Sequence, residues 1–273
     1  MDWLYEKNKN NTSRYVLGTV GHKPLVCIGI NPSTAEPGKL DNTLASVERI
    51  SLANGYDSWI MLNVYPQRST DPNNLHELRD FTIDRDNMNA IRMILEEYKP
   101  TIWAAWGRII HKRPYLMNSL YEIIGASKAN GCRWVNAGPL LKDGHPHHPL
   151  YLKSTEQLRD FDADAYVKKV GIRCVFSYVK ILKNQSRFDT SDFNQALLNA
   201  GLLDNPYYNK FITQPMNMDM ELNRLENGDI DLTKALLTGI MREENATGYS
   251  FDKRIQNGDV MRVLLKLREQ LNN

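Results

Sequence analysis

Four short segments in a fixed order, each at the end of a predicted strand, constrain the fold of this chain more than any other feature. They cover residues 29–33, 62–65, 103–107 and 147–151. In an open α/β sheet, ligands bind in the crevice outside the carboxyl ends of the strands. We therefore expect the four segments to converge on one pocket. Their two Asn, their His and the turns fixed by Pro and Gly suit recognition of a heterocycle and stabilisation of a leaving anion.

Apolar runs alternate with helical periodicity through the first 170 residues. The sequence predicts strands at residues 25–29, 59–62, 101–106 and 133–136. It predicts helices from the Asp41 cap to the Asn54-Gly55 stop, at 83–98, at 109–124 with an interruption near Pro114, and from the Ser154 cap to about Lys169. This alternation predicts an α/β fold with a doubly wound, mostly parallel sheet.

The pattern changes beyond residue 170. Helical periodicity recurs at residues 175–183, 192–200, 218–225, 232–242 and 260–271, with turn signals at 205–206, 227–228 and 257–258. We therefore expect two domains: an α/β domain at residues 1–170 and a small all-α C-terminal domain at 171–273. The second domain could dock a protein partner, dimerise or lengthen a DNA-binding surface, and its residues indicate no chemistry.

Composition and charge narrow the class of protein. The formal net charge is +2, so whole-chain electrostatics do not force a nucleic-acid partner, although a local basic groove stays open. No stretch approaches the roughly 20 apolar residues of a membrane span, and the N-terminus lacks the features of a signal peptide, which favours the cytoplasm. The three cysteines, Cys27, Cys132 and Cys174, have no metal-ligand or cluster spacing and suit free buried thiols. We expect no cofactor.

Several short motifs occur in a fixed order. They are Asn31-Pro32-Ser33-Thr34-Ala35, Asp41 with Thr43, Asn63 with Arg68-Ser69-Thr70-Asp71-Pro72, Trp106-Gly107, and His148-Pro149-Leu150-Tyr151. The ordered set resembles the uracil-DNA glycosylase superfamily. Within it, the chain is similar to the bacterial and phage family known as domain of unknown function 1643. The resemblance covers about residues 14–170 and implies a three-layer α/β/α domain that acts on DNA.

The resemblance also implies roles for three residues. Asn31 falls where the superfamily positions the attacking water, Asn63 where it reads the base, and His148 where it stabilises the oxygen of the departing base. The chain departs from the uracil-specific members, because Ser33 follows the first motif where those enzymes have an aromatic residue. The resemblance therefore does not imply specificity for uracil.

Chemistry adds further candidates. An Asn amide is a poor base, so Asp41 or Asp71, on nearby loops, could supply the base that cleavage of a glycosidic bond needs. Asn63 offers both a donor and an acceptor for a base edge. Leu150, Tyr151 and Leu152 beside Lys153 suit a wedge inserted into DNA with a phosphate contact. The other candidates for substrate binding are Gly29, Pro32, Ser33, Tyr65, Arg68, Asp71 and Trp106.

Each candidate also has a purely structural interpretation. Asn31 before Pro32 suits an Asx-turn, Asn63 a loop cap, and Asp41 a helix cap. Arg68 either binds a phosphate or pairs with Asp71, and Trp106 is more typical of a core. A further alternative is a metal site of His145, His147 and His148, but no carboxylate or Cys stands at ligand spacing, and the first two suit solvent-exposed positions.

Three functions fit these residues. The first is a DNA glycosylase that hydrolyses the N-glycosidic bond of a modified or mismatched base. The second is a catalytically weak or inactive module that binds DNA or a nucleotide, for example in phage defence or counter-defence. The third is a hydrolase of small nucleosides or nucleotides. Fold-level analogy does not choose among them.

Overall fold

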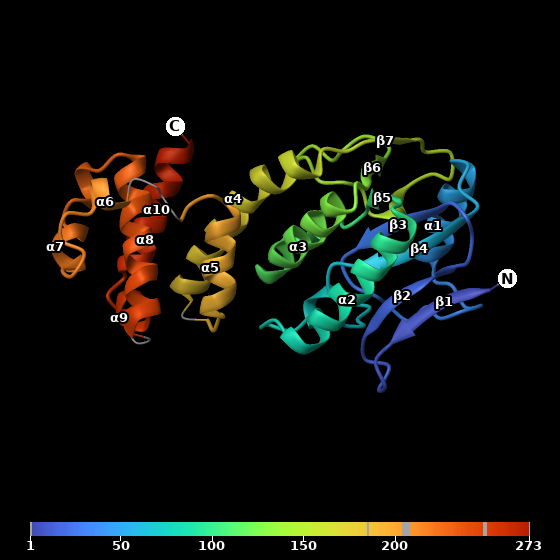
Figure 1. Cartoon of the computed structure of the whole chain (residues 1–273), viewed down its shortest axis with the longest axis horizontal. Helices are drawn as coiled ribbons and strands as arrows, with labels where there is room; N and C mark the ends of the chain where they lie inside the picture. Colours follow the sequence, from blue (N-terminus) through green and yellow to red (C-terminus); the bar gives the residue numbers. More distant parts are fainter. Residues whose placement is uncertain (1, 185, 204–207, 248–249, 273) are drawn as a thin grey trace. The chain divides into compact units, whose positions relative to one another are not determined.

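The computed structural model describes residues 2–184, 186–203, 208–247 and 250–272 (Figure 1). It divides into two compact units, Met1–Val167 and Lys168–Asn273, so the division falls three residues before the boundary expected from the sequence. The turn expected at residues 205–206 lies outside the described residues. None of the described helices combines the length and apolar character needed to cross a membrane.

The first unit is built on a seven-stranded sheet. In spatial order its strands are β1 (Trp3–Lys7), β2 (Arg14–Thr19), β4 (Ser58–Asn63), β3 (Pro24–Gly29), β5 (Thr101–Ala104), β6 (Arg133–Ala137) and β7 (Leu158–Asp160). The central strands β4, β3, β5 and β6 pair in parallel, whereas β1, β2 and β7 pair antiparallel. The sheet is therefore mixed: the parallel sheet expected from the sequence is its centre, and its edges are antiparallel.

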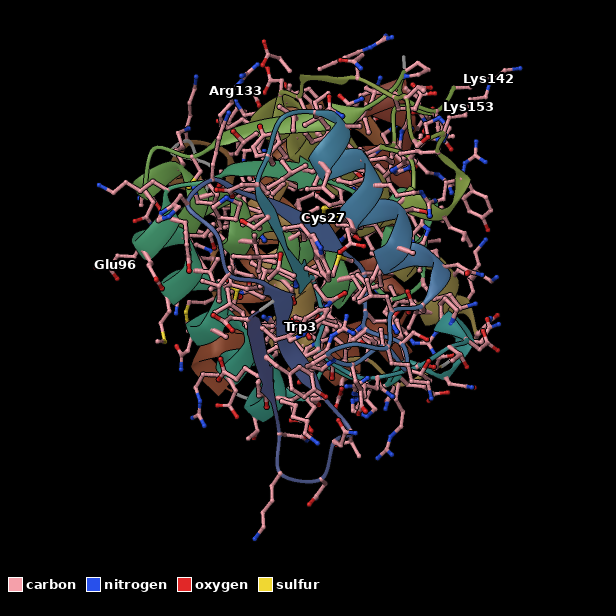
Figure 2. The ribbon with its side chains drawn as sticks, turned by 90° about the vertical axis from the view of Figure 1, so that its right-hand side faces the viewer. Trp3, Cys27, Glu96, Arg133, Lys142 and Lys153 are labelled. Atoms are coloured by element: carbon pink, nitrogen blue, oxygen red, sulfur yellow. The ribbon has the colours of Figure 1, made fainter. Side chains whose placement is uncertain are left out.

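Helices connect the parallel strands on both faces of the sheet: α1 (Asn42–Ala53), α2 (Phe81–Tyr98) and α3 (Tyr115–Ala129) (Figure 1). Apolar side chains of α1 pack on one face in a core that includes Cys27, which lies inside the molecule in Figure 2. On the other face, Trp134 of β6 donates to Ser127 of α3 at 2.8 Å. The connections leave β3 and β5 toward opposite faces, and this divergence opens a crevice at their carboxyl ends.

Local signals explain the ends of α1. The Asp41 carboxylate accepts from the Leu44 N–H at 2.9 Å and so caps the helix. Asn54 ends it, and Gly55 follows with φ +78°, a conformation that glycine adopts without a steric penalty. Both the expected cap and the expected stop are confirmed.

The helix expected at residues 154–169 is confirmed only over residues 163–169, and its first part is wrong. Residues 158–160 form β7 at the edge of the sheet, and α4 (Ala163–Lys183) begins only after it. Asn54 explains the difference, because its side chain donates to the Glu156 carbonyl at 3.0 Å and accepts from the Leu158 N–H at 3.1 Å. These contacts hold the backbone extended, and they come from a residue about 100 positions earlier that local periodicity does not include.

Other elements differ from the expectation in smaller ways. Strand β5 ends at Ala104 rather than at residue 106, and the short 3₁₀ helix η2 (Gly107–His111) separates it from α3. Two more 3₁₀ turns, η1 (Pro72–Asn74) and η3 (Pro149–Tyr151), lie in the connections after β4 and β6. The N-terminal strands β1 and β2 were not expected.

The second unit is helical in its described residues. It holds the rest of α4 together with α5 (Thr190–Asn199), α6 (Tyr208–Phe211), α7 (Met218–Leu222), η4 (Leu225–Asn227), α8 (Ile230–Thr247), α9 (Ser250–Gln256) and α10 (Asp259–Asn272). The segment at 175–183 is the second half of α4 rather than a separate helix. Phe193, Leu236 and Phe251 lie in the core of this unit. Arg254, 6% exposed, ties Glu243 and Asp259 together.

The three cysteines are free. Cys27 and Cys174 are buried, and burial raises the pKa of both thiols. Cys132 is only partly buried, so the expectation of a buried thiol is wrong there.

Candidate functional site

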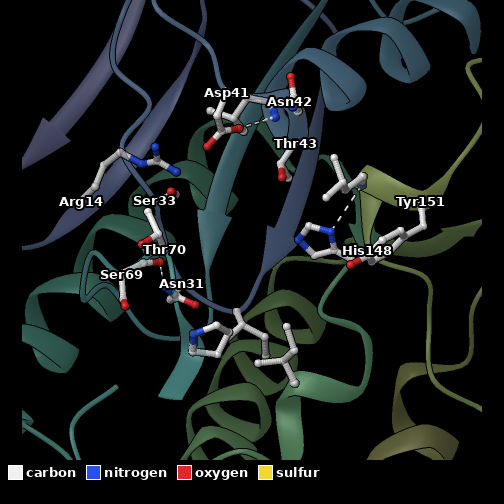
Figure 3. Close-up of a pocket in the computed structure, with 15 residues that line it drawn as sticks. Arg14, Asn31, Ser33, Asp41, Asn42, Thr43, Ser69, Thr70, His148 and Tyr151 are labelled. Carbon is white, nitrogen blue, oxygen red and sulfur yellow. Dashed lines mark hydrogen bonds between the residues drawn. The ribbon is translucent and has the colours of Figure 1, made fainter. Parts of the chain in front are cut away.

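A pocket of about 400 Å³ opens at the carboxyl ends of the parallel strands (Figure 3). The loops after β3, β4, β5 and β6 all contribute to its wall. The lining residues are Arg14, Ile30, Asn31, Ser33, Asp41, Asn42, Thr43, Leu44, Ser69, Thr70, Pro72, Ile109, His148, Leu150 and Tyr151. A pocket of this size holds one small ligand such as a nucleotide unit.

The four segments predicted to converge do so only in part. The first and fourth segments supply Asn31, Ser33, His148, Leu150 and Tyr151 to the wall. No residue of segments 62–65 and 103–107 lines it, because these residues are buried in the sheet and the core. Residues further along the same connections line the pocket in their place.

Asn31 has a fixed orientation. Its amide nitrogen donates to the Ser69 carbonyl at 2.8 Å and to the Pro32 carbonyl at 3.1 Å. Because these acceptors take the amide hydrogens, the side-chain oxygen Oδ1 is the atom left for the pocket, and it can only accept. Asn31 therefore anchors the loop after β4 and presents an acceptor suited to a water molecule.

Asp41 is the one carboxylate in the pocket wall. Its Oδ1 caps α1 through Leu44, so Oδ2 is the oxygen available to a ligand. The charge of Asp41 acts on two other lining residues, since it raises the pKa of both Arg14 and His148 against the effect of burial. The role of Asp41 as a helix cap is therefore compatible with a role in the pocket.

His148 is a half-buried imidazole held by its own loop. Its Nδ1 accepts from the Leu150 N–H at 3.4 Å, so in the neutral ring the proton resides on Nε2. Burial lowers the pKa of His148, which keeps the ring neutral at pH 7. Gly107, with φ +61°, lets the chain turn beside the His148 backbone. The ring is thus set up as a neutral hydrogen-bond donor.

The lowered pKa predicts a pH dependence of stability. Below the ordinary His pKa of 6.5, the unfolded chain binds a proton at His148 that the folded chain does not. The free energy of unfolding therefore decreases as the pH is lowered below 6.5. Above it both states are neutral and the penalty vanishes. We expect His148→Gln to lose less stability than the wild type between pH 7.5 and pH 5, as measured by thermal unfolding. Equal losses would contradict the lowered pKa.

Asn63 does not reach the pocket wall. It is 0% exposed, and neither polar atom of its side chain has a hydrogen-bond partner among the described residues. Its backbone carbonyl accepts from Asn87 at 2.9 Å, and the Oδ1 of Asn87 is also without a partner there. The residue expected to read the base is therefore buried at the end of β4.

This orphaned amide predicts a gain in stability on substitution. An unsatisfied buried amide costs roughly 1–3 kcal/mol, which an apolar side chain of similar shape does not incur. We expect Asn63→Leu to raise the free energy of unfolding by about 1 kcal/mol and the Tm by about 2–4 °C. A large loss of stability would instead mean that a bound water or ligand satisfies Asn63.

The other sequence candidates fall into two groups. Gly29, Pro32, Tyr65 and Trp106 are buried and line no described pocket. Tyr65 contacts Nδ1 of His76 through its hydroxyl at 2.8 Å, so it belongs to the packing between the β4 loop and α3. Trp106 donates to the Tyr166 hydroxyl at 2.9 Å, which supports its interpretation as core.

Three charged candidates also lie off the pocket wall. Asp71 is exposed and caps η1 through the Asn73 N–H. Arg68 pairs with Glu36 at 4.0 Å, so the expected pairing with Asp71 is wrong. Lys153 is exposed and projects from the same corner as Lys142 in Figure 2.

The three histidines of the loop after β6 separate. His145 is 2% exposed, so the expectation that it is solvent-exposed is wrong. Its ring contacts the Tyr166 hydroxyl at 2.8 Å and His111 at 3.0 Å. In the part of the chain that the structure describes, no group of three or more His, Cys, Asp or Glu side chains could hold a metal ion.

A second pocket, of about 460 Å³, shares Ile109, His148 and Tyr151 with the first. The rest of its lining is Gly107, Arg108, Leu141 and His147, and most of its surface is apolar. His148 therefore stands on a wall between the first pocket, which is lined mostly by polar residues and is called the polar pocket below, and the apolar second pocket. Sequence spacing does not reveal this arrangement.

Sequence reasoning missed Arg14, Asn42 and Thr70 as pocket residues. Arg14 lies in β2, a strand that was not expected, and its side chain is 2% exposed. The local sequence pattern gave no signal for Arg14, because its burial follows from a strand that the pattern did not indicate.

Fold and site define an α/β protein with a polar ligand pocket at the carboxyl ends of a central parallel sheet. The chain belongs to a family described as protein of unknown function (DUF1643), whose family model matches residues 14–150. The match runs from β2 to η3 and so includes every residue that lines the pocket except Tyr151. Neither the curated proteins nor the solved structures gave a match.

Proposed function

We propose that this protein hydrolyses the N-glycosidic bond of a nucleotide unit, with a modified or mismatched base in DNA as the substrate. The position of His148 between the two pockets carries the proposal. A neutral Nε2–H donor at that wall suits a base in the apolar pocket that leaves a sugar in the polar one. The resemblance to the uracil-DNA glycosylase superfamily and its three-layer fold supports the same reaction.

The chemistry divides among three side chains. The bond between the sugar C1′ and the base nitrogen breaks, and its electron pair goes to the base, whose oxygen or nitrogen accepts the hydrogen bond from His148. Asp41 faces the positive charge that develops on the sugar and takes a proton from the attacking water. Asn31 orients that water through Oδ1. The water oxygen bonds to C1′, and the base leaves as an anion that takes up the proton from Asp41 through solvent. The products are a free base and an abasic sugar.

Access to a base in DNA requires that it leave the stack. Leu150 and Tyr151 are 43% and 78% exposed at the pocket rim, whereas Leu152 packs against the α1 core. The first two suit the wedge that fills the gap in the stack, with Lys153 beside them for a phosphate. This arrangement supports DNA over a free nucleoside.

A specific observation also favours a hydrolase of free nucleotides. Arg14, a buried cation, lies in the wall of the polar pocket, where it suits a phosphate carried by a small ligand. Free nucleotides therefore belong in the same test as DNA.

Base release read by mass spectrometry tests the proposal. The substrates are DNA with uracil, mismatched thymine or modified cytosines, and the matching free nucleotides. We expect a freed base from the wild type and none from a double variant of Asp41 and His148. Tight binding of one substrate with no release from any would contradict hydrolysis and favour a binding module.

A further inference from the structure

Arg14 is a buried guanidinium with few partners. It is 2% exposed, and its Nη1 donates to the Ala35 carbonyl at 3.1 Å. Its Nε is buried and has no partner among the described residues. A guanidinium carries five N–H donors, so the described residues use only a small part of the hydrogen-bonding capacity of Arg14. Figure 3 shows this side chain at the pocket, on the side of Ser33.

A second guanidinium lies next to the first. Arg68 donates to the same Ala35 carbonyl at 3.3 Å, to the Ser33 carbonyl at 2.5 Å and to the Tyr5 hydroxyl at 2.9 Å. Its Nε is nevertheless buried without a partner in the described part of the chain. Burial and, after it, the charge of Arg68 lower the pKa of Arg14 to about 10. Holding two cations side by side in a buried place is costly unless an anion joins them.

The nearby carboxylates do not fill that need. Asp41 caps α1 with one oxygen, and no hydrogen bond joins it to Arg14 among the described residues. Glu36 lies 4.0 Å from Arg68 and is 45% exposed, so water screens this pair. Neither carboxylate contacts the buried Nε of either arginine.

The rest of the pocket wall suits an anion as well. The 12-residue helix α1 begins at the pocket with Asn42 and Thr43, and the first N–H groups of a helix have no partner within it. The positive end of the helix dipole favours a phosphate there. The hydroxyls of Ser33, Thr43 and Thr70 add donors on the same wall.

We propose that the polar pocket binds a phosphate group of the substrate, held by Arg14 with Arg68 behind it and by the N-terminus of α1. The proposed phosphate site rests on the proposed function only in one respect, which is the identity of the group that carries the phosphate. The phosphate is either the terminal group of a free nucleotide or an internal diester of a strand. In both cases a nucleoside without phosphate is a poor ligand.

Calorimetric titration tests the phosphate subsite without any turnover. The probes are inorganic phosphate, deoxyuridine, its 5′-monophosphate, and a short deoxyuridine oligonucleotide without terminal phosphates. We expect the nucleotide or the oligonucleotide to bind at least about 10-fold more tightly than deoxyuridine. Tighter binding of the monophosphate assigns a terminal group, and tighter binding of the oligonucleotide assigns a diester. Equal binding of deoxyuridine, its monophosphate and the oligonucleotide would overturn the proposal.

Variants locate the subsite. We expect Arg14→Met to lose most of the preference for phosphate, and Thr70→Val at the exposed rim to lose about 3- to 5-fold while staying folded. The control is Arg133→Met, an exposed arginine that pairs with Asp160 away from the pocket. If Thr70→Val and a folded Arg14→Met both kept the wild-type preference for phosphate, the assignment would be overturned. It would also be overturned if Arg133→Met lost as much of this preference as Arg14→Met.

The phosphate site and the proposed hydrolysis can be disproved independently of each other. A preference for phosphate without base release would remove the proposed hydrolysis and leave the subsite in place. Base release with no preference for phosphate would support hydrolysis and remove the phosphate subsite.

Discussion

Asp41→Asn is expected to lower base release by about 100-fold or more, because a carboxylate positioned as base contributes about 10²–10⁴ to such reactions. Asn caps a helix as well as Asp does, so the bond to the Leu44 N–H and the stability of α1 are retained. The substitution therefore removes the charge at the pocket and little else. Single-turnover kinetics on the best substrate, together with thermal unfolding of both proteins, measure the two effects.

Asp71→Asn is the matched control. Asp71 caps η1 in the same way that Asp41 caps α1, but it is exposed and does not line the pocket. The sequence left both carboxylates open as the base. We expect wild-type rates from Asp71→Asn. Loss in this variant with normal rates in Asp41→Asn would exchange their roles and contradict the pocket assignment.

His148→Ala is the second large effect. Removal of a donor aimed at a developing anion costs about 10²–10³ in rate. The loss should fall on kcat rather than on KM, because the hydrogen bond strengthens as charge moves onto the base. His148→Gln keeps an N–H donor and should recover part of the rate. The measurement is kcat and KM for the three proteins on one substrate.

An exposed histidine provides the control for His148. His22 lies in the turn before β3, away from the pocket, and His22→Gln should leave both parameters unchanged. A raised KM with normal kcat in His148→Ala would mean that the ring only binds substrate. That outcome would contradict its role toward the leaving base.

The sequence predicted the elements whose signals are local. The strands at Leu25 and Trp59 and the ends of α1 follow from apolar runs, a cap and an Asn-Gly stop. The edge strand β7 did not follow, because its extended backbone depends on Asn54, a distant residue. Long-range contacts of this kind override a plausible capping signal such as that at Ser154.

The site was predictable where a turn carries the side chain. Asn31, Asp41 and His148 line the pocket because each follows a strand or caps a helix that the sequence indicates. Asn63 was expected in the pocket but is buried, because the side chain of the last residue of a strand can point into the core as readily as into the crevice. Arg14 was missed because its burial depends on a strand that the local pattern did not indicate.

Single-turnover base release in water enriched in ¹⁸O tests hydrolysis in the pocket directly. Hydrolysis in the pocket predicts a free base from the wild type, one ¹⁸O atom on the abasic sugar, and neither product at an appreciable rate from Asp41→Asn. Base release without ¹⁸O in the sugar, or substrate binding with no release at all, would contradict the account.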